Sequence, residues 1–441
     1  MNIKEIKQRM IDQREDLEST FNAEKIIDRE VLPNYKNLLK SNLIKAVTGH
    51  RRAGKSVLCY QLVRNKNCAY INFDDELLAG LKAEDLNLVL RAFYEIYGKL
   101  DYILLDEIQN IEKWELFANR LKRKGINLII TGSNANLLSR ELSTHLTGRH
   151  FSLEIYPFSF REFLNFYGVE YKKDYFSTRQ TAVIRKELEK YILNGGFPES
   201  MKEPNPKRYL ASLYSDVLTK DIILRHNIKL VDTMKQISNY LISNYSCHIT
   251  FNKLKNIFGI KSVHTAQDYA FFLAETYTVF FIERFSFKVK ERITAPVKVY
   301  AIDTGLINAL TAGSSRNMGR LYENLTAVEL MRRKTFGRGY DVYYWQDYFG
   351  REVDFVIKEG TEIKRLMQVC YDVENYDTKS REIKSLLKAS EKLKVKRCSL
   401  LCITSDYEAE EKHENRVIKF IPLWKWLCGC IPNKSADWLK F

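Results

Sequence analysis

The chain has 441 residues, of which 45% are hydrophobic and 28% charged, with 8 Pro and 19 Gly, a globular composition that excludes collagen-like, low-complexity and wholly disordered proteins. At about 150 residues per domain, this length allows two to four domains. The 70 Lys and Arg exceed the 55 Asp and Glu by 15, a surplus that suits a polyanionic partner such as nucleic acid, although many basic proteins bind none.

The first part of the chain is predicted to be helical and the second to be an α/β domain. Residues 1–40 carry apolar positions such as Ile6, Met10 and Ile11 at helical spacing. In residues 41–158 short apolar runs alternate with helical stretches, which is typical of a parallel sheet with crossover helices. The strands are expected at 43–48, 68–73, 102–105, 127–131 and 150–155.

The rest of the chain is predicted to contain a helical region and a second α/β domain. Helical periodicity dominates residues 159–290, and residues 291–441 return to mixed α and β patterns. In this last part we expect strands at 340–345, 352–357, 365–371 and 398–404, and a helix at 381–393.

A complete phosphate-binding motif, GHRRAGKS, occupies residues 49–56 between an expected strand and an expected helix. Its glycines allow backbone N–H groups to wrap the β-phosphate at the helix N-terminus. Lys55 can neutralise the β- and γ-phosphates while the Ser56 hydroxyl binds Mg²⁺. The predicted nucleotide-binding residues are Gly49, Arg51, Arg52, Ala53, Gly54, Lys55, Ser56 and Val57, and Lys55 is also predicted to be catalytic.

Two acidic residues follow the buried apolar run 102–105, at the carboxyl end of an expected strand, where open α/β sheets bind ligands. Asp106 is predicted to hold the water shell of Mg²⁺, and Glu107 to polarise the attacking water as the catalytic base. Together with the phosphate motif, this pair favours hydrolysis of ATP over phosphoryl transfer to a small acceptor. No Asn/Thr-Lys-x-Asp guanine motif is present, so ATP is preferred over GTP.

Two further residues are candidates for sensing or stabilising the γ-phosphate. Ser133, just after the strand at 127–131, either senses the γ-phosphate or belongs to a turn with a helix N-cap. Arg149 is a candidate arginine finger for a neighbouring subunit, with a plain surface arginine as the simpler alternative.

The motifs resemble those of a family of bacterial and archaeal AAA+ ATPases that join a P-loop domain to a winged-helix region and a restriction-endonuclease-like domain of uncharacterised function. The resemblance implies a RecA/AAA-like sheet with Asp106 and Glu107 on a strand beside the phosphate-loop strand, then a winged helix and a C-terminal PD-(D/E)xK-like domain. Beyond the phosphate motif it is carried by LDEIQ at 105–109, ITGS at 130–133, PFSFREF at 157–163, GGFPE at 195–199, KDI at 220–222 and YAIDTGL at 300–306.

A helix-turn-helix order can be recognised independently in residues 249–260 and 262–276, with Gly259 ending the first helix. A recognition helix would present Lys261, His264, Thr265 and Gln267 to DNA. Because many winged helices are protein-docking modules, contact with DNA and contact with a protein both stay open.

The tail carries an incomplete nuclease motif. PD-(D/E)xK nucleases hold a divalent metal ion with carboxylates, and their lysine positions or activates water. By resemblance Glu323 and Asp354 would supply the carboxylates, but the third element reads Gln368-Val369-Cys370, which lacks both the acid and the lysine. A nuclease fold kept as a scaffold is favoured over an active site rearranged around Lys358 or Lys364.

Other compositional signals are weak. The 8 cysteines show no disulfide or zinc spacing, which favours free thiols in a reducing compartment. The charged N-terminus is unlike a signal peptide, and no apolar run reaches the roughly 20 residues of a membrane span. We therefore expect a cytoplasmic protein without a membrane partner.

The leading functional prediction is an ATPase that uses ATP and Mg²⁺ to drive a conformational change, with nucleic acid as a candidate partner. The alternative is an ATP-gated protein-interaction switch of low turnover with an inactive nuclease-like tail, whose partner would be another protein or a second copy of the chain. A third hypothesis is an ATP-powered nuclease, which needs Asp354 to bind metal.

Overall fold

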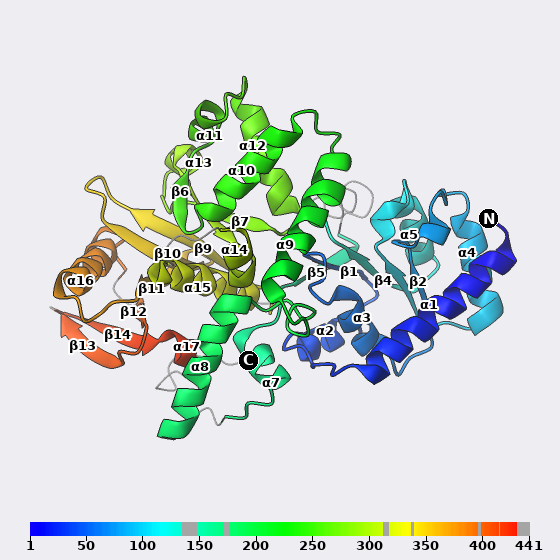
Figure 1. The fold of residues 1–441 in the computed structure, drawn as a ribbon, viewed down its shortest axis with the longest axis horizontal. Helices are drawn as coiled ribbons and strands as arrows, with labels where there is room; N and C mark the ends of the chain where they lie inside the picture. The colour runs from blue at the N-terminus through cyan, green and yellow to red at the C-terminus, as the bar shows by residue number, and fades with distance from the viewer. Residues whose placement is uncertain are drawn as a thin grey trace. The chain divides into compact units, whose positions relative to one another are not determined.

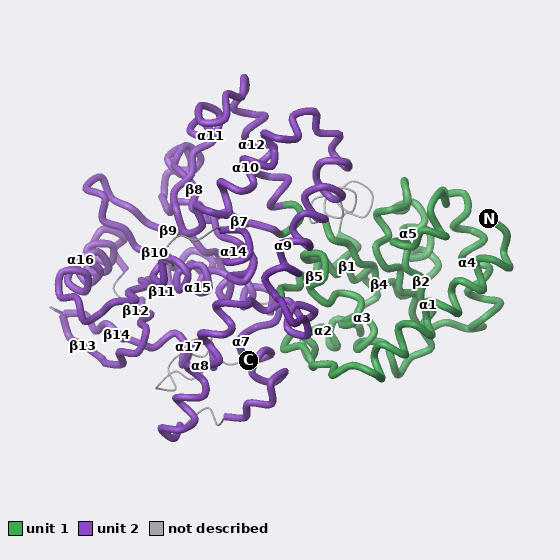
Figure 2. The backbone as a smooth tube through the Cα atoms, viewed as in Figure 1, with its two compact units in different colours: residues 1–157, 275–277 green, residues 158–274, 278–441 purple. Residues whose placement is uncertain are grey.

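The computed structural model describes residues 1–134, 148–171, 176–311, 317–336, 339–395, 398–413 and 415–429 (Figure 1). They form two compact units (Figure 2). The first contains residues 1–157 and 275–277, and the second contains residues 158–274 and 278–441. The four domains expected at 1–40, 41–158, 159–290 and 291–441 stay a prediction.

The first unit contains the alternating strands and helices expected from its sequence. Its strands are β1 (Ile44–Gly49), β2 (Cys68–Asn72), β3 (Tyr102–Asp106), β4 (Asn127–Gly132) and β5 (His150–Ile155). Its α-helices are α1 (Ile3–Ala23), α2 (Leu32–Leu38), α3 (Lys55–Val63), α4 (Leu86–Tyr97) and α5 (Trp114–Arg123), with short 3₁₀ turns at Glu76–Leu78 and Ile108–Asn110. The expected strands and the helical start of the chain are therefore confirmed.

The sheet of the first unit is fully parallel, with strand order β2-β3-β4-β1-β5. This is the arrangement of a RecA/AAA-like P-loop fold. The expectation that the acidic strand lies beside the phosphate-loop strand is wrong, because β4 pairs with β1 on one side and with β3 on the other. After β3 the chain returns to form β4 between β3 and β1. The pattern of apolar runs predicts where the strands lie in the sequence but not their order in the sheet.

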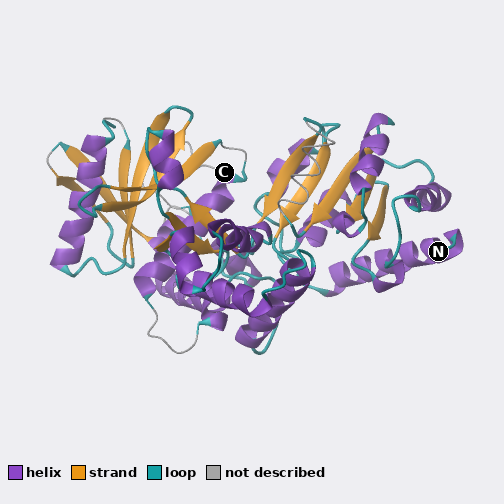
Figure 3. Cartoon of the chain, turned by 90° about the horizontal axis from the view of Figure 1, so that it is seen from above, coloured by secondary structure: helices purple, strands orange, loops and turns teal. Residues whose placement is uncertain are grey.

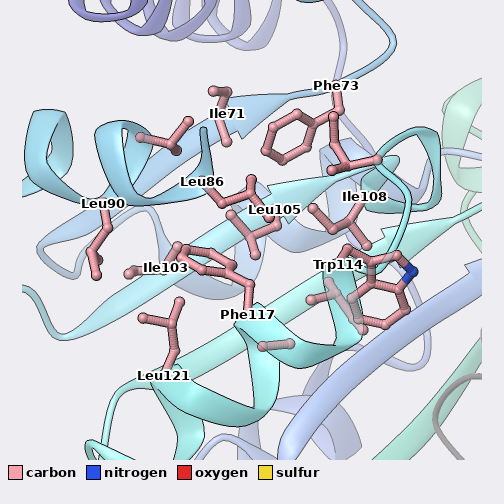
Figure 4. Close-up of a cluster of buried hydrophobic side chains, with 14 of the residues drawn as sticks. Ile71, Phe73, Leu86, Leu90, Ile103, Leu105, Ile108, Trp114, Phe117 and Leu121 are labelled. Carbon is pink, nitrogen blue, oxygen red and sulfur yellow. The ribbon is translucent and has the colours of Figure 1, made fainter. Parts of the chain in front are cut away.

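One face of this sheet is covered by α1, α4 and α5 (Figure 4). Leu86, Val89, Leu90 and Phe93 follow helical spacing along α4 and are buried, which is why this segment forms an amphipathic helix. Trp114 at the start of α5 is 1% exposed and belongs to the same cluster. Helix α3 contacts β1, β3 and β4, and α2 packs on α3.

The second unit contains more helices and two sheets. Its α-helices are α7 (Phe160–Phe166), α8 (Thr178–Asn194), α9 (Pro206–Asp216), α10 (Val231–Ser243), α11 (Phe251–Ile257), α12 (Val263–Glu275), α13 (Val289–Thr294), α14 (Thr304–Leu310), α15 (Met318–Lys334), α16 (Tyr376–Lys392) and α17 (Leu423–Leu427), and a π-helix covers Val217–Leu224. Its strands, drawn in orange in Figure 3 with those of the first unit, are β6 (Cys247–Ile249), β7 (Val279–Ile282), β8 (Val297–Ala301), β9 (Tyr340–Gln346), β10 (Glu352–Glu359), β11 (Glu362–Cys370), β12 (Ser399–Thr404), β13 (Ala409–His413) and β14 (Arg416–Pro422).

The smaller sheet is antiparallel, with order β6-β8-β7. The two helices expected at 249–260 and 262–276 are present as α11 and α12, between β6 and β7. The Thr250 side chain accepts a hydrogen bond from Lys253 N and begins α11 as its N-cap. The element order here is α10-β6-α11-α12-β7-α13-β8.

The larger sheet is mixed, with order β13-β14-β12-β11-β10-β9. Strands β9, β10 and β11 are antiparallel neighbours, whereas β11, β12 and β14 run parallel. The four expected strands of the tail are present, and α16 starts five residues before the expected helix at 381–393. Strands β13 and β14 were not expected.

A buried ion cluster holds α15 within the second unit. Glu329 is 1% exposed; its Oε1 lies 2.7 Å from Arg333 Nε and 3.7 Å from Arg161 Nη2, and its Oε2 accepts from Arg332 Nη1. Although burial opposes ionisation, Arg333, Arg332 and Arg161 lower the pKa of Glu329 to about 2. The Arg333 guanidinium also lies 4.2 Å from the ring centre of Trp426.

Two general features concern only the described part of the chain. None of its helices has both the length and the apolar character needed to cross a bilayer. Its cysteines form no disulfide.

Replacing Glu329 by Gln should lower the free energy of unfolding by about 3–5 kcal/mol, because neighbouring buried arginines lose their counter-charge. The wild-type pKa lies below the ordinary value of 4.5, so the contribution is present above pH 4.5 and is lost as pH falls toward 2. Urea denaturation at a series of pH values measures the free energy of unfolding of both proteins. The two free energies should converge as the pH falls from 4.5 toward 2. The control is Glu391→Gln, whose exposed carboxylate pairs with Lys388 at 2.7 Å; a similar loss there would contradict the argument.

Candidate functional site

The phosphate motif forms the loop between β1 and α3, and two glycines permit its path. Gly49 has φ +151°, and a Cβ at this position would lie 2.3 Å from the carbonyl oxygen of Ile155 on β5. Gly54 caps α3 with φ +91°, a conformation that other residues adopt only with strain. The loop therefore ends at a helix N-terminus, whose backbone N–H groups favour an anion.

Lys55 lies inside this loop. Its Nζ is 3.3 Å from the carbonyl oxygens of Gly49 and His50 and 3.3 Å from Glu107 Oε1, and the side chain is 4% exposed. The ammonium is thus held between the loop and one acid. A phosphate group entering the loop would meet a cation held at the loop.

Asp106 ends β3 and is 1% exposed. Its Oδ1 accepts from the Thr131 hydroxyl, and its Oδ2 accepts from Tyr70 Oη at 3.2 Å. Burial and the charge of Glu107 raise the pKa of Asp106, while hydrogen bonds from Ser56 and Thr131 oppose that rise. The predicted Mg²⁺ ligands Ser56 and Asp106 therefore lie within hydrogen-bonding reach of each other.

Glu107 follows in the left-handed region, with φ +49°. This turn lets its N–H donate to Thr131 Oγ1 at 2.9 Å, and Gln109 Nε2 donates to its Oε2 at 2.5 Å. Burial opposes ionisation, but Lys55 and Gln109 lower the pKa of Glu107 below its ordinary value. The carboxylate is therefore ionised at neutral pH, as a base must be to accept a proton.

The remaining loop residues have different surroundings. Arg51 Nη2 lies 2.7 Å from Asp74 Oδ2 at the end of β2, and Arg52 is exposed with φ +65°. Ala53 is buried, and Val57 is half-buried in the first turn of α3. Burial lowers the pKa of His50 to about 4, so its imidazole is neutral at pH 7.

Ser133 and Arg149 lie at opposite edges of the sheet. Ser133 follows β4 at the carboxyl edge; its side chain is buried, and its Oγ has no hydrogen-bond partner among the described residues. Arg149 precedes β5 at the amino edge, where its Nη1 donates to Asn119 Oδ1 at 2.6 Å. Arg149 is therefore away from the phosphate loop of its own unit, and the segment 135–147 between the two residues lies outside the described residues.

Two residues that the motif analysis missed support this site. Thr131 lies on β4, in register with Val47 of β1, and bonds to both acidic residues. Arg29 is buried before α2 and donates to the carbonyl oxygens of Ala53 at 2.9 Å and Tyr156 at 2.5 Å. The sequence contains Thr131 in the ITGS segment, but only the strand order reveals its partners.

The tail residues expected to form a nuclease-like cluster do come together. Glu323 lies on α15, Asp354 on β10 and Gln368 on β11. Gln368 Oε1 accepts from Asp354 N at 3.2 Å, and its Nε2 donates to Glu382 Oε2 at 2.7 Å. The cluster opens into a pocket of about 470 Å³.

The lysine in this cluster is neither of the two expected ones. Lys358 donates to the Gly360 carbonyl and Lys364 pairs with Glu362. Instead, Lys298 of β8 contacts Glu323 and Asp354. Burial, together with Asp354, raises the pKa of Glu323 to about 7 despite Lys298. The sequence offered no sign of this because Lys298 lies outside the motif.

Comparison with protein families divides the chain into three matched segments. Residues 41–164 match the AAA domain family, residues 185–317 a domain of unknown function (DUF8612), and residues 318–426 a second domain of unknown function (DUF4143). Together with the parallel sheet and the phosphate loop, the first match makes this unit a P-loop AAA ATPase domain, a class that binds ATP.

Comparison with whole proteins finds relatives in archaea and bacteria. The uncharacterised protein MJ1544 of Methanocaldococcus jannaschii is 35% identical over 416 residues, which cover 91% of both chains. An uncharacterised protein of Haemophilus influenzae is 28% identical over 349 residues, 76% of this chain and 84% of that one. Among solved structures, the Walker-type ATPase PABY2304 of Pyrococcus abyssi matches with a TM-score of 0.43 and 15% identity, over 65% of this chain and 96% of that one.

Replacing Thr131 by Val should lower the free energy of unfolding by about 1–3 kcal/mol, because a buried acceptor on Asp106 loses its donor. Thr131→Ser keeps the hydroxyl and should recover most of this loss. Urea denaturation of the three proteins without nucleotide measures the effect. Equal stability of the Val variant and the wild type would show that the hydroxyl contributes nothing to the carboxylate.

Proposed function

The chain belongs to the family of the M. jannaschii protein MJ1544, and we propose that it hydrolyses ATP with Mg²⁺ to drive a conformational change. The observation that carries the proposal is the approach of Lys55 Nζ to Glu107 Oε1, 3.3 Å, at the end of a complete phosphate loop. A cation for the phosphates and a carboxylate base thereby lie in one site.

In this proposal different groups of the chain bind the phosphates, bind the cation and accept the proton. Backbone N–H groups of residues 49–57 and the Lys55 ammonium bind the phosphates. The Ser56 hydroxyl and Asp106 fit a hard cation, since both offer oxygen ligands, and Mg²⁺ there would neutralise charge on the β- and γ-phosphates. Glu107 accepts the proton of the attacking water, and Ser133 contacts the γ-phosphate from the same edge of the sheet.

The second unit is proposed to connect ATP turnover to nucleic acid. Its element order α10-β6-α11-α12-β7-α13-β8, with sheet order β6-β8-β7 and the short helix α13 between β7 and β8, supports a winged helix. On and before α12, Lys261 and His264 are exposed, while Thr265 and Gln267 are half-buried. The surplus of 15 positive charges in the chain favours a polyanion as the partner.

The tail is proposed to have a restriction-endonuclease-like fold. The order α15-β9-β10-β11-α16-β12, with Glu323 on the helix and Asp354 on the second strand, supports that assignment. The loss of the acid and lysine of the third element supports a scaffold over a nuclease. Arg149, at the amino edge of the sheet, is available to a neighbouring copy as an arginine finger only if the protein assembles.

We expect Lys55→Ala to abolish Mg²⁺-dependent ATP hydrolysis, because the phosphates lose their cation. Glu107→Gln should retain ATP binding while hydrolysis falls by about 100-fold or more, as for loss of a general base. Phosphate release and fluorescent-ATP binding measure the two effects separately. Lys66→Ala, an exposed lysine beyond α3, is the control. If the wild type neither binds nor hydrolyses ATP, the proposed function fails.

The proposed partner can be tested by measuring the ATPase rate and duplex mobility with and without DNA over a salt series. Phosphate contacts release counterions, so binding should weaken steeply as salt rises. Retained ATPase activity without any DNA shift at low salt would contradict the nucleic-acid role and favour the protein-interaction switch. Single-stranded DNA and RNA in parallel samples distinguish the kinds of nucleic acid.

A further inference from the structure

The carboxylate cluster of the tail surrounds a lysine ammonium. Lys298 Nζ lies 2.7 Å from Glu323 Oε1, 2.5 Å from Glu352 Oε1 and 3.1 Å from Asp354 Oδ1. The lysine side chain is 3% exposed, and it reaches the cluster from β8, a strand of the smaller sheet. Three carboxylates from α15 and β10 thus share one buried cation that the chain itself supplies.

Two of these carboxylates, Glu323 and Asp354, are the ones that a nuclease-like fold would use for a divalent metal ion. We propose that Lys298 takes the place of that metal ion, so that the tail holds its carboxylates together without metal and does not cleave phosphodiesters. The proposal rests on the restriction-endonuclease-like fold proposed for the tail and is independent of ATP hydrolysis in the first unit.

The Lys298 ammonium lies where a metal ion held by these carboxylates would have to bind. Its Nζ donates to Glu323 Oε1 at 2.7 Å and to Asp354 Oδ1 at 3.1 Å, and it forms an ion pair with Glu352 Oε1 at 2.5 Å. Among the described residues no group of three or more acidic, His or Cys side chains is arranged to hold a metal ion. A divalent ion between these carboxylates would also be repelled by the ammonium at close range.

The ammonium is anchored at its position. Lys298 lies on β8, the central strand of the smaller sheet. In the backbone register it lies opposite His248 of β6 and Ile282 of β7. A metal ion could bind between the carboxylates only if the buried Lys298 ammonium moved into solvent or into an apolar region. Moving the charge away from its acidic partners costs free energy unless the ammonium finds another partner. A metal ion would therefore have to displace a cation that the fold holds in place.

The other polar groups of the cluster already have partners inside the protein. Tyr300 Oη donates to Glu323 Oε1 at 2.7 Å, and Val369 N donates to Asp354 Oδ2 at 2.9 Å. Gln368 bridges Asp354 N and Glu382, so its amide replaces an acidic ligand with an internal hydrogen bond. These contacts pair the carboxylates with protein groups at the wall of the pocket, and the amide of Gln368 takes the place of the third acid of the motif.

The test is Mn²⁺ titration of the full-length protein without nucleotide, followed by electron paramagnetic resonance of the free ion. Wild type and Asp354→Asn should bind the same amount of Mn²⁺, because the tail contributes no site. Lys298→Met keeps the aliphatic volume but removes the charge, and it should gain one Mn²⁺ per chain. That gain should disappear in the double variant that combines Lys298→Met with Asp354→Asn. The single variant Lys298→Arg keeps the positive charge and should bind no additional Mn²⁺.

The first unit is identical in all these proteins, so any Mn²⁺ bound near Asp106 cancels in the comparison. Wild-type Mn²⁺ binding that Asp354→Asn removes would overturn the proposal, and this measurement needs no change at Lys298. A folded Lys298→Met protein, verified by circular dichroism, that gains no Mn²⁺ would overturn it as well. Mn²⁺-dependent cleavage of DNA or RNA by the wild type, lost in Asp354→Asn, would contradict the absence of nuclease activity.

Discussion

The position of β4 between β1 and β3 determines how the nucleotide site is built. The strands are parallel, so their carboxyl ends meet at one edge, but β1 and β3 are two strand spacings, about 10 Å, apart. Thr131 fills the gap, donating to Asp106 and accepting from the N–H of Glu107. The acids are thereby oriented by a neutral hydroxyl, which leaves Glu107 free to approach Lys55.

Each unit contains a buried lysine, Lys55 in the first and Lys298 in the second, and the two lysines differ in how strongly their partners hold them. In the first unit Lys55 has one acidic partner and two backbone carbonyls, all at 3.3 Å. These are long contacts that an ATP phosphate could replace. In the tail Lys298 has three acidic partners, the nearest at 2.5 Å, which leaves little for a ligand to improve. The number and length of these contacts thus favour a lysine that can exchange partners in the first unit and one that keeps its partners in the tail.

Most elements could be predicted because their apolar residues repeat with a clear period. Strands β1, β3 and β4 of the first unit are short runs that are buried almost throughout, whereas the edge strand β5 is only partly buried, and the limits of all five strands agree closely with expectation. Strand β13, with sequence AEEKH, was missed because an edge strand with charged, partly exposed side chains has no apolar alternation. Strands β6 and β7 are too short to show a period of their own.

The sequence by itself determined the chemistry of the phosphate loop, because a run of eight adjacent residues contains the glycines, the lysine and the hydroxyl that phosphate and Mg²⁺ require. It also determined the alternation of strands and helices around that loop. Only the tertiary structure decided the strand order, the partners of Thr131 and Arg29, and the position of Lys298. These depend on contacts between residues distant in the chain, such as Lys298 and Asp354, 56 positions apart, whose meeting no local pattern records.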